Sequence, residues 1–169
     1  MKETAIPFGR LLLVVCLLTC STTVGASPFD QGRQSVSLVV GSGSSFNDNY
    51  IIVGAGYGYY VLKGLELGID AQAWLDGSPR IYKLSPQVKY VLDLSEKFKP
   101  YVGTFYRRTY TEGLDDLNSY GYRVGLIFLG DRGTYFGAGY VYEEYQDCTT
   151  TIYNDCSTSY PEILFSLSF

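Results

Sequence analysis

The sequence contains no histidine and no basic tract. Histidine is the usual general base of acyl-transfer and proteolytic sites, so its absence argues against enzymes of those classes. A net charge of −4 argues against binding to nucleic acid. We therefore expect no enzymatic activity, no catalytic residue and no cofactor. A zinc site at Cys148 and Cys156 would also lack ligands, because there is no histidine and these are only two thiols.

Long hydrophobic runs are also missing: after residue 26, none reaches 18 residues. The apolar run Leu11–Leu18 is far shorter than the roughly 20 residues that a spanning helix needs. It follows the cations Lys2 and Arg10 and precedes the small residues that end at Ala26. This order is typical of a secretory signal peptide. It predicts a cleaved signal at residues 1–26 and one exported domain at residues 27–169.

A lipoprotein signal is the alternative for the same segment. Leu17-Leu18-Thr19-Cys20 loosely resembles a lipobox, although Thr19 fits poorly just before the cysteine. A cleaved secretory signal therefore remains the favoured interpretation.

Cysteine is scarce, with four copies, and two of them lie in the predicted signal peptide. Cys148 and Cys156 would then be the pair left in the exported chain. A pair of cysteines in an exported protein predicts a disulfide, here one that closes a short loop.

Tyrosine and glycine are abundant instead, with 17 and 19 copies. Apolar residues alternate with polar residues or glycine in eight segments that are separated by turn residues. Alternation with a period of two is typical of β-strands with two different faces. The eight segments are Ser35–Gly41, Tyr50–Val61, Leu65–Leu75, Arg80–Leu92, Pro100–Tyr110, Ser119–Leu129, Thr134–Tyr145 and Ser159–Phe169.

The two faces of these segments differ sharply. One face is apolar and carries nine tyrosines: Tyr57, Tyr59, Tyr82, Tyr90, Tyr106, Tyr120, Tyr122, Tyr140 and Tyr142. The other face carries glycines together with four acids and four bases: Glu66, Asp70, Lys83, Lys89, Arg107, Arg123, Glu143 and Glu162. A membrane barrel has an apolar exterior and a polar interior, and buried charges must be paired. We therefore predict an all-β fold, an eight-stranded antiparallel up-and-down transmembrane β-barrel whose lumen holds a charge network. A soluble barrel with a solvated charged face is the alternative.

The last segment has a further pattern, because apolar residues occupy alternate positions up to the final residue. These are Ile163, Phe165, Leu167 and Phe169. The segment resembles the terminal strand of bacterial outer-membrane barrels. The stretches Pro100–Gly103 and Tyr135–Tyr140 also resemble strands of the small eight-stranded OmpA/OmpX/OmpW-like class. The resemblance implies an outer-membrane protein of a Gram-negative bacterium, with a terminal strand that the barrel-assembly machinery recognises. It does not assign a subfamily.

An even number of strands would place both termini in the periplasm. The segments at 42–49, 76–79, 111–118 and 146–158 would then be outer loops, mostly longer than the turns at 62–64, 93–98 and 130–133. In this arrangement Arg108 would face outward near the extracellular rim, where it could meet lipopolysaccharide phosphates.

The expected function is a non-enzymatic integral barrel with a filled lumen and a structural or surface-interaction role. Its expected partners are outer-membrane lipid, lipopolysaccharide and the barrel-assembly machinery, and we expect a monomer. A narrow porin-like channel for small solutes, as in OmpW-like barrels, is one alternative. A soluble, secreted, lipocalin-type ligand-binding barrel is another.

Overall fold

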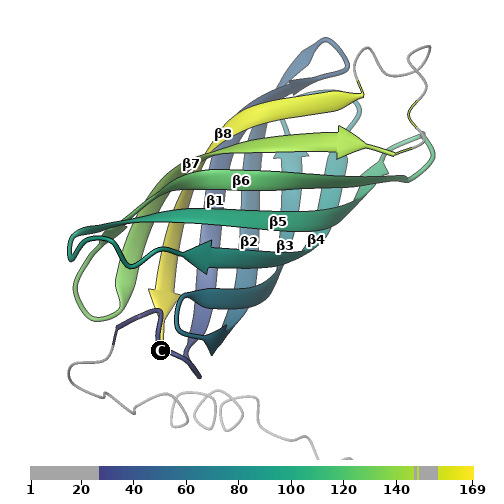
Figure 1. Cartoon of the computed structure of the whole chain (residues 1–169). Coiled ribbons are helices and arrows are strands. Elements are labelled where there is room, and N and C mark those ends of the chain that lie inside the picture. The colour runs from purple at the N-terminus through teal and green to yellow at the C-terminus, as the bar shows by residue number, and fades with distance from the viewer. Residues whose placement is uncertain (1–26, 147, 149–155) are drawn as a thin grey trace, which may run out of the picture.

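The computed structural model describes residues 27–146, 148 and 156–169, and within them it forms one closed β-barrel without helices (Figure 1). Every strand pairs antiparallel with the next, and β1 pairs with β8 to close the barrel. This confirms the predicted eight-stranded architecture. The strands are β1 Gln34–Ser45, β2 Asp48–Leu62, β3 Leu65–Leu75, β4 Ile81–Val91, β5 Phe98–Thr111, β6 Leu117–Leu129, β7 Thr134–Tyr145 and β8 Ser157–Ser168.

The predicted signal peptide lies outside the described residues. No helix among the described residues is long and apolar enough to cross a membrane.

The barrel wall follows the period of two seen in the sequence, with large apolar side chains on its outer surface. Along β2, for example, Tyr50, Ile52 and Tyr60 point inward and are buried, whereas Ile51 and Val53 are exposed. Eight of the nine tyrosines assigned to the apolar face are exposed on the outer surface, and Tyr142 is half-buried. The polar or glycine face of each strand therefore lines the lumen.

One predicted loop was wrong, because the strands β1 and β2 continue through residues 42–49. Ser42 pairs with Ile51 and Ser45 with Asp48, so the loop shrinks to Phe46 and Asn47. Both residues have positive φ, at 52° and 63°, as a two-residue type I′ hairpin turn requires. The serines and glycines before this turn do not alternate with apolar residues, so the sequence pattern ended before the strand did.

The two ends of the barrel carry different connections. The terminus end holds the start of β1, the end of β8 and the turns at 63–64, 92–97 and 130–133. The loop end holds the connections at 46–47, 76–80, 112–116 and 146–156. The expectation that loops are mostly longer than turns holds in part: the connections at 76–80, 112–116 and 146–156 are longer than the turns at 63–64 and 130–133, but only the last exceeds the turn at 92–97.

The lumen is packed with side chains along its length. One buried apolar cluster lies at the terminus end and includes Tyr60, Tyr101 and Tyr135. A second lies toward the loop end and includes Trp74 and Tyr160. Buried charged side chains occupy the lumen between the two clusters. An eight-stranded barrel is just wide enough for side chains to fill in this way.

Candidate functional site

All eight charged residues predicted for the lumen lie inside the barrel and are buried. They come from inward positions of six strands, β3 to β8. The residues are Glu66, Asp70, Lys83, Lys89, Arg107, Arg123, Glu143 and Glu162, called here the lumen charge network.

Glu143 is shared by two cations in the part of the network nearer the loop end. Its Oε2 lies 2.8 Å from Lys83 Nζ and 2.9 Å from Arg107 Nη1. Its other oxygen, Oε1, accepts a hydrogen bond of 2.6 Å from Ser119 Oγ. Each oxygen of this fully buried carboxylate therefore has a partner, as a charge removed from water requires.

The chain of charges continues across the lumen from Arg107. Arg107 Nη2 lies 3.7 Å from Asp70 Oδ1, and Asp70 Oδ2 lies 3.2 Å from Arg123 Nη2. Arg123 Nη1 then lies 3.6 Å from Glu162 Oε1. Six charges thus alternate in sign, from Lys83 through Glu143, Arg107, Asp70 and Arg123 to Glu162.

The remaining two charges of the network form a separate pair. Lys89 Nζ lies 2.9 Å from Glu66 Oε1, and Ser35 Oγ donates to Glu66 Oε2 at 3.1 Å. Gly58 leaves space for this carboxylate, since a Cβ at that position would lie 2.5 Å from the Glu66 Cδ. The inward glycines of β2 therefore make room for charges that reach over from β3.

Uncharged groups complete the network, and sequence reasoning did not single them out. Arg107 donates from Nε to Ser85 Oγ at 2.6 Å and from Nη1 to the Tyr160 hydroxyl at 2.7 Å. The Tyr101 hydroxyl donates to Glu162 Oε1 at 3.3 Å, and Gln72 donates to Asp70 Oδ1 at 3.2 Å. Their inward register in the alternating pattern was the signal that could have found them.

Lys99 is a further buried lysine that the prediction missed, because the predicted strand began at Pro100. It pairs with Asp93 in the turn between β4 and β5, and Lys63 lies 2.9 Å from the other oxygen of Asp93. Hydrogen bonds from Lys99 and Lys63 lower the pKa of Asp93 to about 2. The hydrogen bond to Asp93 and its negative charge raise the pKa of Lys63.

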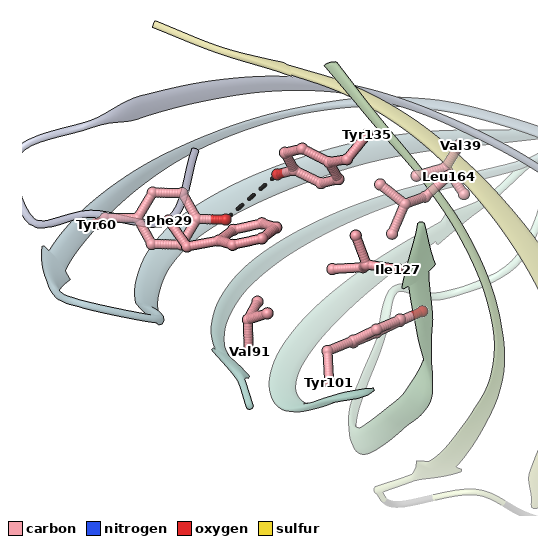
Figure 2. Close-up of a cluster of buried hydrophobic side chains, with 8 residues drawn as sticks. All are labelled: Phe29, Val39, Tyr60, Val91, Tyr101, Ile127, Tyr135 and Leu164. Carbon is pink, nitrogen blue, oxygen red and sulfur yellow. Dashed lines mark hydrogen bonds between the residues drawn. The ribbon is translucent and has the colours of Figure 1, made fainter. Parts of the chain in front are cut away.

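Phe29, from the chain before β1, packs into the buried apolar cluster at the terminus end of the lumen (Figure 2). Phe29 is buried there, and its ring centroid lies 5.8 Å from that of Tyr60 and 5.1 Å from that of Tyr135. Backbone bonds hold the segment in place, from Gly32 N to Tyr60 O and from Gly64 N to Phe29 O, each 2.8 Å. No alternating pattern covers this segment, so its packing could not be predicted from the sequence.

The described residues of the loop end enclose a hollow. A cavity of about 350 Å³, called here the loop-end cup, lies inside the rim. Hydroxyl-bearing side chains dominate its lining, among them Ser45, Thr109, Thr111 and Thr158, and Ile81 and Phe46 add apolar surface. The cup lies beside the second apolar cluster, which includes Ile81.

The remaining predicted residues lie outside the lumen. Cys148 and Cys156 form a disulfide in the connection between β7 and β8, with a Cα–Cα distance of 5.6 Å. Arg108 faces outward, and its Nη2 lies 2.9 Å from Asp116 Oδ2.

The terminal-strand residues Ile163, Phe165, Leu167 and Phe169 are exposed on the outer surface of β8 and just beyond its end. The described part of the chain contains no cluster of three or more potential metal ligands.

No family model matches the sequence, and no curated protein matches it either. Solved structures do match. The N-terminal β-barrel domain of Pseudomonas aeruginosa OprF aligns with a TM-score of 0.62 at 12% identity, over 82% of this chain and 98% of that one. Neisserial surface protein A aligns with a TM-score of 0.60 at 16% identity, over 81% and 96%.

A transmembrane β-barrel from de novo design matches about as well, with a TM-score of 0.59 at 16% identity over 83% and 98% of the two chains. The chain therefore has the fold of small eight-stranded outer-membrane barrels. A designed barrel among the matches shows that the shared feature is the architecture, which by itself does not define a role.

Proposed function

We propose that this protein is a non-enzymatic integral barrel of the outer membrane, with a closed, charge-paired lumen and a structural or surface-interaction role. The observation that carries the proposal is the distribution of side chains between the two faces of the wall. Exposed apolar residues cover the outside, and the lumen charge network lies within.

This distribution is costly in water and favourable in a bilayer. Soluble monomers rarely expose a continuous apolar surface larger than a few hundred Å². Here the outward positions of all eight strands carry exposed large apolar side chains, such as Leu38, Ile69, Val102 and Phe165. Many of them are tyrosines, which suit the boundary between lipid and water. A secreted lipocalin-type barrel would need the opposite arrangement, so the membrane is favoured.

The proposed location implies specific partners. Lipid would cover the apolar wall, and the terminal strand that ends at Phe169 would be the segment that the barrel-assembly machinery recognises. Lipopolysaccharide is a further proposed partner at the loop end. Arg108 would have to exchange Asp116 for a phosphate group to take part. The closure of the barrel by its own β1 and β8 supports a monomer.

A narrow channel for small solutes is the second candidate, and the packing of the lumen disfavours it. The apolar cluster with Phe29 closes the terminus end, and the six-charge chain crosses the middle. An ion would have to displace paired charges to pass, which costs far more than passage through water.

Cell fractionation tests the location. We expect the protein in the detergent-resistant outer-membrane fraction, with faster gel migration before boiling than after it. A soluble periplasmic protein and an inner-membrane protein serve as fractionation controls. Recovery with the soluble control, without a change in migration on boiling, would overturn the proposed membrane location.

A further inference from the structure

The loop-end cup has the size and position of a ligand site. Its volume of about 350 Å³ lies within the range of small-molecule pockets, about 300–1,000 Å³. The mouth of a β-barrel is a frequent place for such sites. The second apolar cluster and the charge network lie below it, so a molecule entering from the loop end would stop there.

One side chain in the cup lacks a partner although it is buried. Thr109 is 3% exposed, lines the cup, and its Oγ1 makes no hydrogen bond within the described part of the chain. A buried hydroxyl without a partner is costly, and most such groups in folded proteins are satisfied. A rotation of the Thr109 side chain about χ1 toward the cup would let a ligand with its own hydroxyl groups supply the missing partner.

The lining of the cup also restricts the charge of a ligand. None of its described lining residues carries a charge. The lumen cation Lys83 already binds Glu143 and the Tyr145 hydroxyl, at 2.8 and 2.9 Å. Against the described lining, an anion or a cation would therefore lose water without gaining an opposite charge. A pure hydrocarbon would instead bury the serine and threonine hydroxyls without partners.

We propose that the loop-end cup binds a neutral sugar, as a single hexose or as one unit of a glycan chain. A sugar ring has hydroxyl groups around its edge for Ser45, Thr109, Thr111 and Thr158, and C–H faces for Phe46 and Ile81. The binding chemistry depends only on the folded barrel. Its exposure at the cell surface rests on the proposed function.

The experiment uses the purified barrel in phosphocholine micelles, because these have no sugar head group that could compete. Saturation-transfer NMR and calorimetric titration compare galactose and N-acetylglucosamine with glucuronate, which adds a negative charge. We expect binding of at least one neutral sugar in the millimolar range and much weaker binding of glucuronate. Absence of binding by both neutral sugars, or equal binding of glucuronate, would overturn the proposal.

A pair of matched variants places the binding in the cup. Thr109→Val removes the buried hydroxyl at nearly constant volume and should weaken the sugar about tenfold, the effect of one lost hydrogen bond. Thr104→Val makes the same change at an exposed position on the outside of the same strand and should bind as the wild type does. Heat-modifiable migration verifies that both variants are folded.

Unchanged affinity in Thr109→Val would place the sugar elsewhere and contradict the proposal. Failure of this test in a protein that fractionates with the outer membrane would leave the proposed function intact. Sugar binding by a protein that does not reach the outer membrane would support the cup as a sugar site and contradict the proposed function.

Discussion

The middle of the lumen and its terminus end are both filled, but by opposite kinds of side chain. In the middle, charges such as Glu143 and Arg107 pair with each other across the barrel. At the terminus end, Phe29 packs on Tyr60 and Tyr135 among aliphatic side chains.

The two regions should therefore fail in different ways. Removing one member of a buried ion pair leaves its partner charged and without compensation, at a cost of several kcal/mol. Removing an apolar side chain costs the lost burial and leaves a cavity. The charged middle depends on every member, whereas the terminus end can partly relax around a gap.

The largest effect is expected in the charged middle, for Glu143→Gln. The variant leaves Lys83 and Arg107 without their shared carboxylate and should lower the free energy of unfolding by about 4 kcal/mol. Urea unfolding in lipid vesicles, followed by the fluorescence of the single tryptophan, Trp74, measures it. Glu144→Gln changes the outward neighbour on the same strand and should cost less than about 0.5 kcal/mol. Similar losses for the two variants would contradict the role of the network.

The terminus end is tested by Phe29→Ala. We expect a loss of about 3 kcal/mol in the same unfolding experiment, because a buried aromatic ring is removed. Leu94→Ala is the control, since Leu94 lies in a turn at the same end with 73% of its surface exposed. If Phe29→Ala is as stable as this control, the segment before β1 does not close the lumen.

The junction between the charged middle and the loop-end cluster is tested by Tyr160→Phe. The variant keeps the ring beside Trp74 but removes the hydroxyl that accepts from Arg107 at 2.7 Å. The expected loss is about 2 kcal/mol, typical of a buried hydrogen bond to a charged group. Tyr140→Phe removes a hydroxyl on the outside of the barrel, where the bond to Ser159 is exposed, and should be nearly neutral. A loss of unfolding free energy no larger than that of Tyr140→Phe would show that the Tyr160 hydroxyl does not stabilise the network.

The smallest effect is expected at Asp93, which lies in an exposed turn at the terminus end. Its pKa of about 2 in the folded protein lies below the unfolded value of about 3.9. The carboxylate therefore stabilises the fold above about pH 4, and this contribution is lost as the pH falls toward 2. Asp93→Asn should flatten the stability profile in that interval, by a small amount because the carboxylate is exposed. An unchanged slope between pH 4 and pH 2 in Asp93→Asn would contradict this role of the carboxylate.

The strands and the direction of their side chains could be predicted because alternation is a local property of the sequence. A register slip would move all eight charges to the lipid face, so the pattern also fixed which residues enter the lumen. It could not reveal which charges meet. Arg123 and Asp70 come from β6 and β3, and their contact depends on the tilt and closure of the whole barrel.

The alternating pattern could not predict two other features, for different reasons. The extension of β1 and β2 past Ser42 rests on backbone pairing, which leaves no mark in side-chain polarity. The insertion of Phe29 rests on a short irregular segment, and a single apolar residue there does not indicate whether it packs into the barrel.

Single-channel recording in planar bilayers tests the closed lumen most directly. The paired charges and the apolar terminus end predict no steady ionic current through the wild-type barrel at moderate voltage. A steady open current, reproduced after purification and absent from a mock preparation, would contradict a filled lumen.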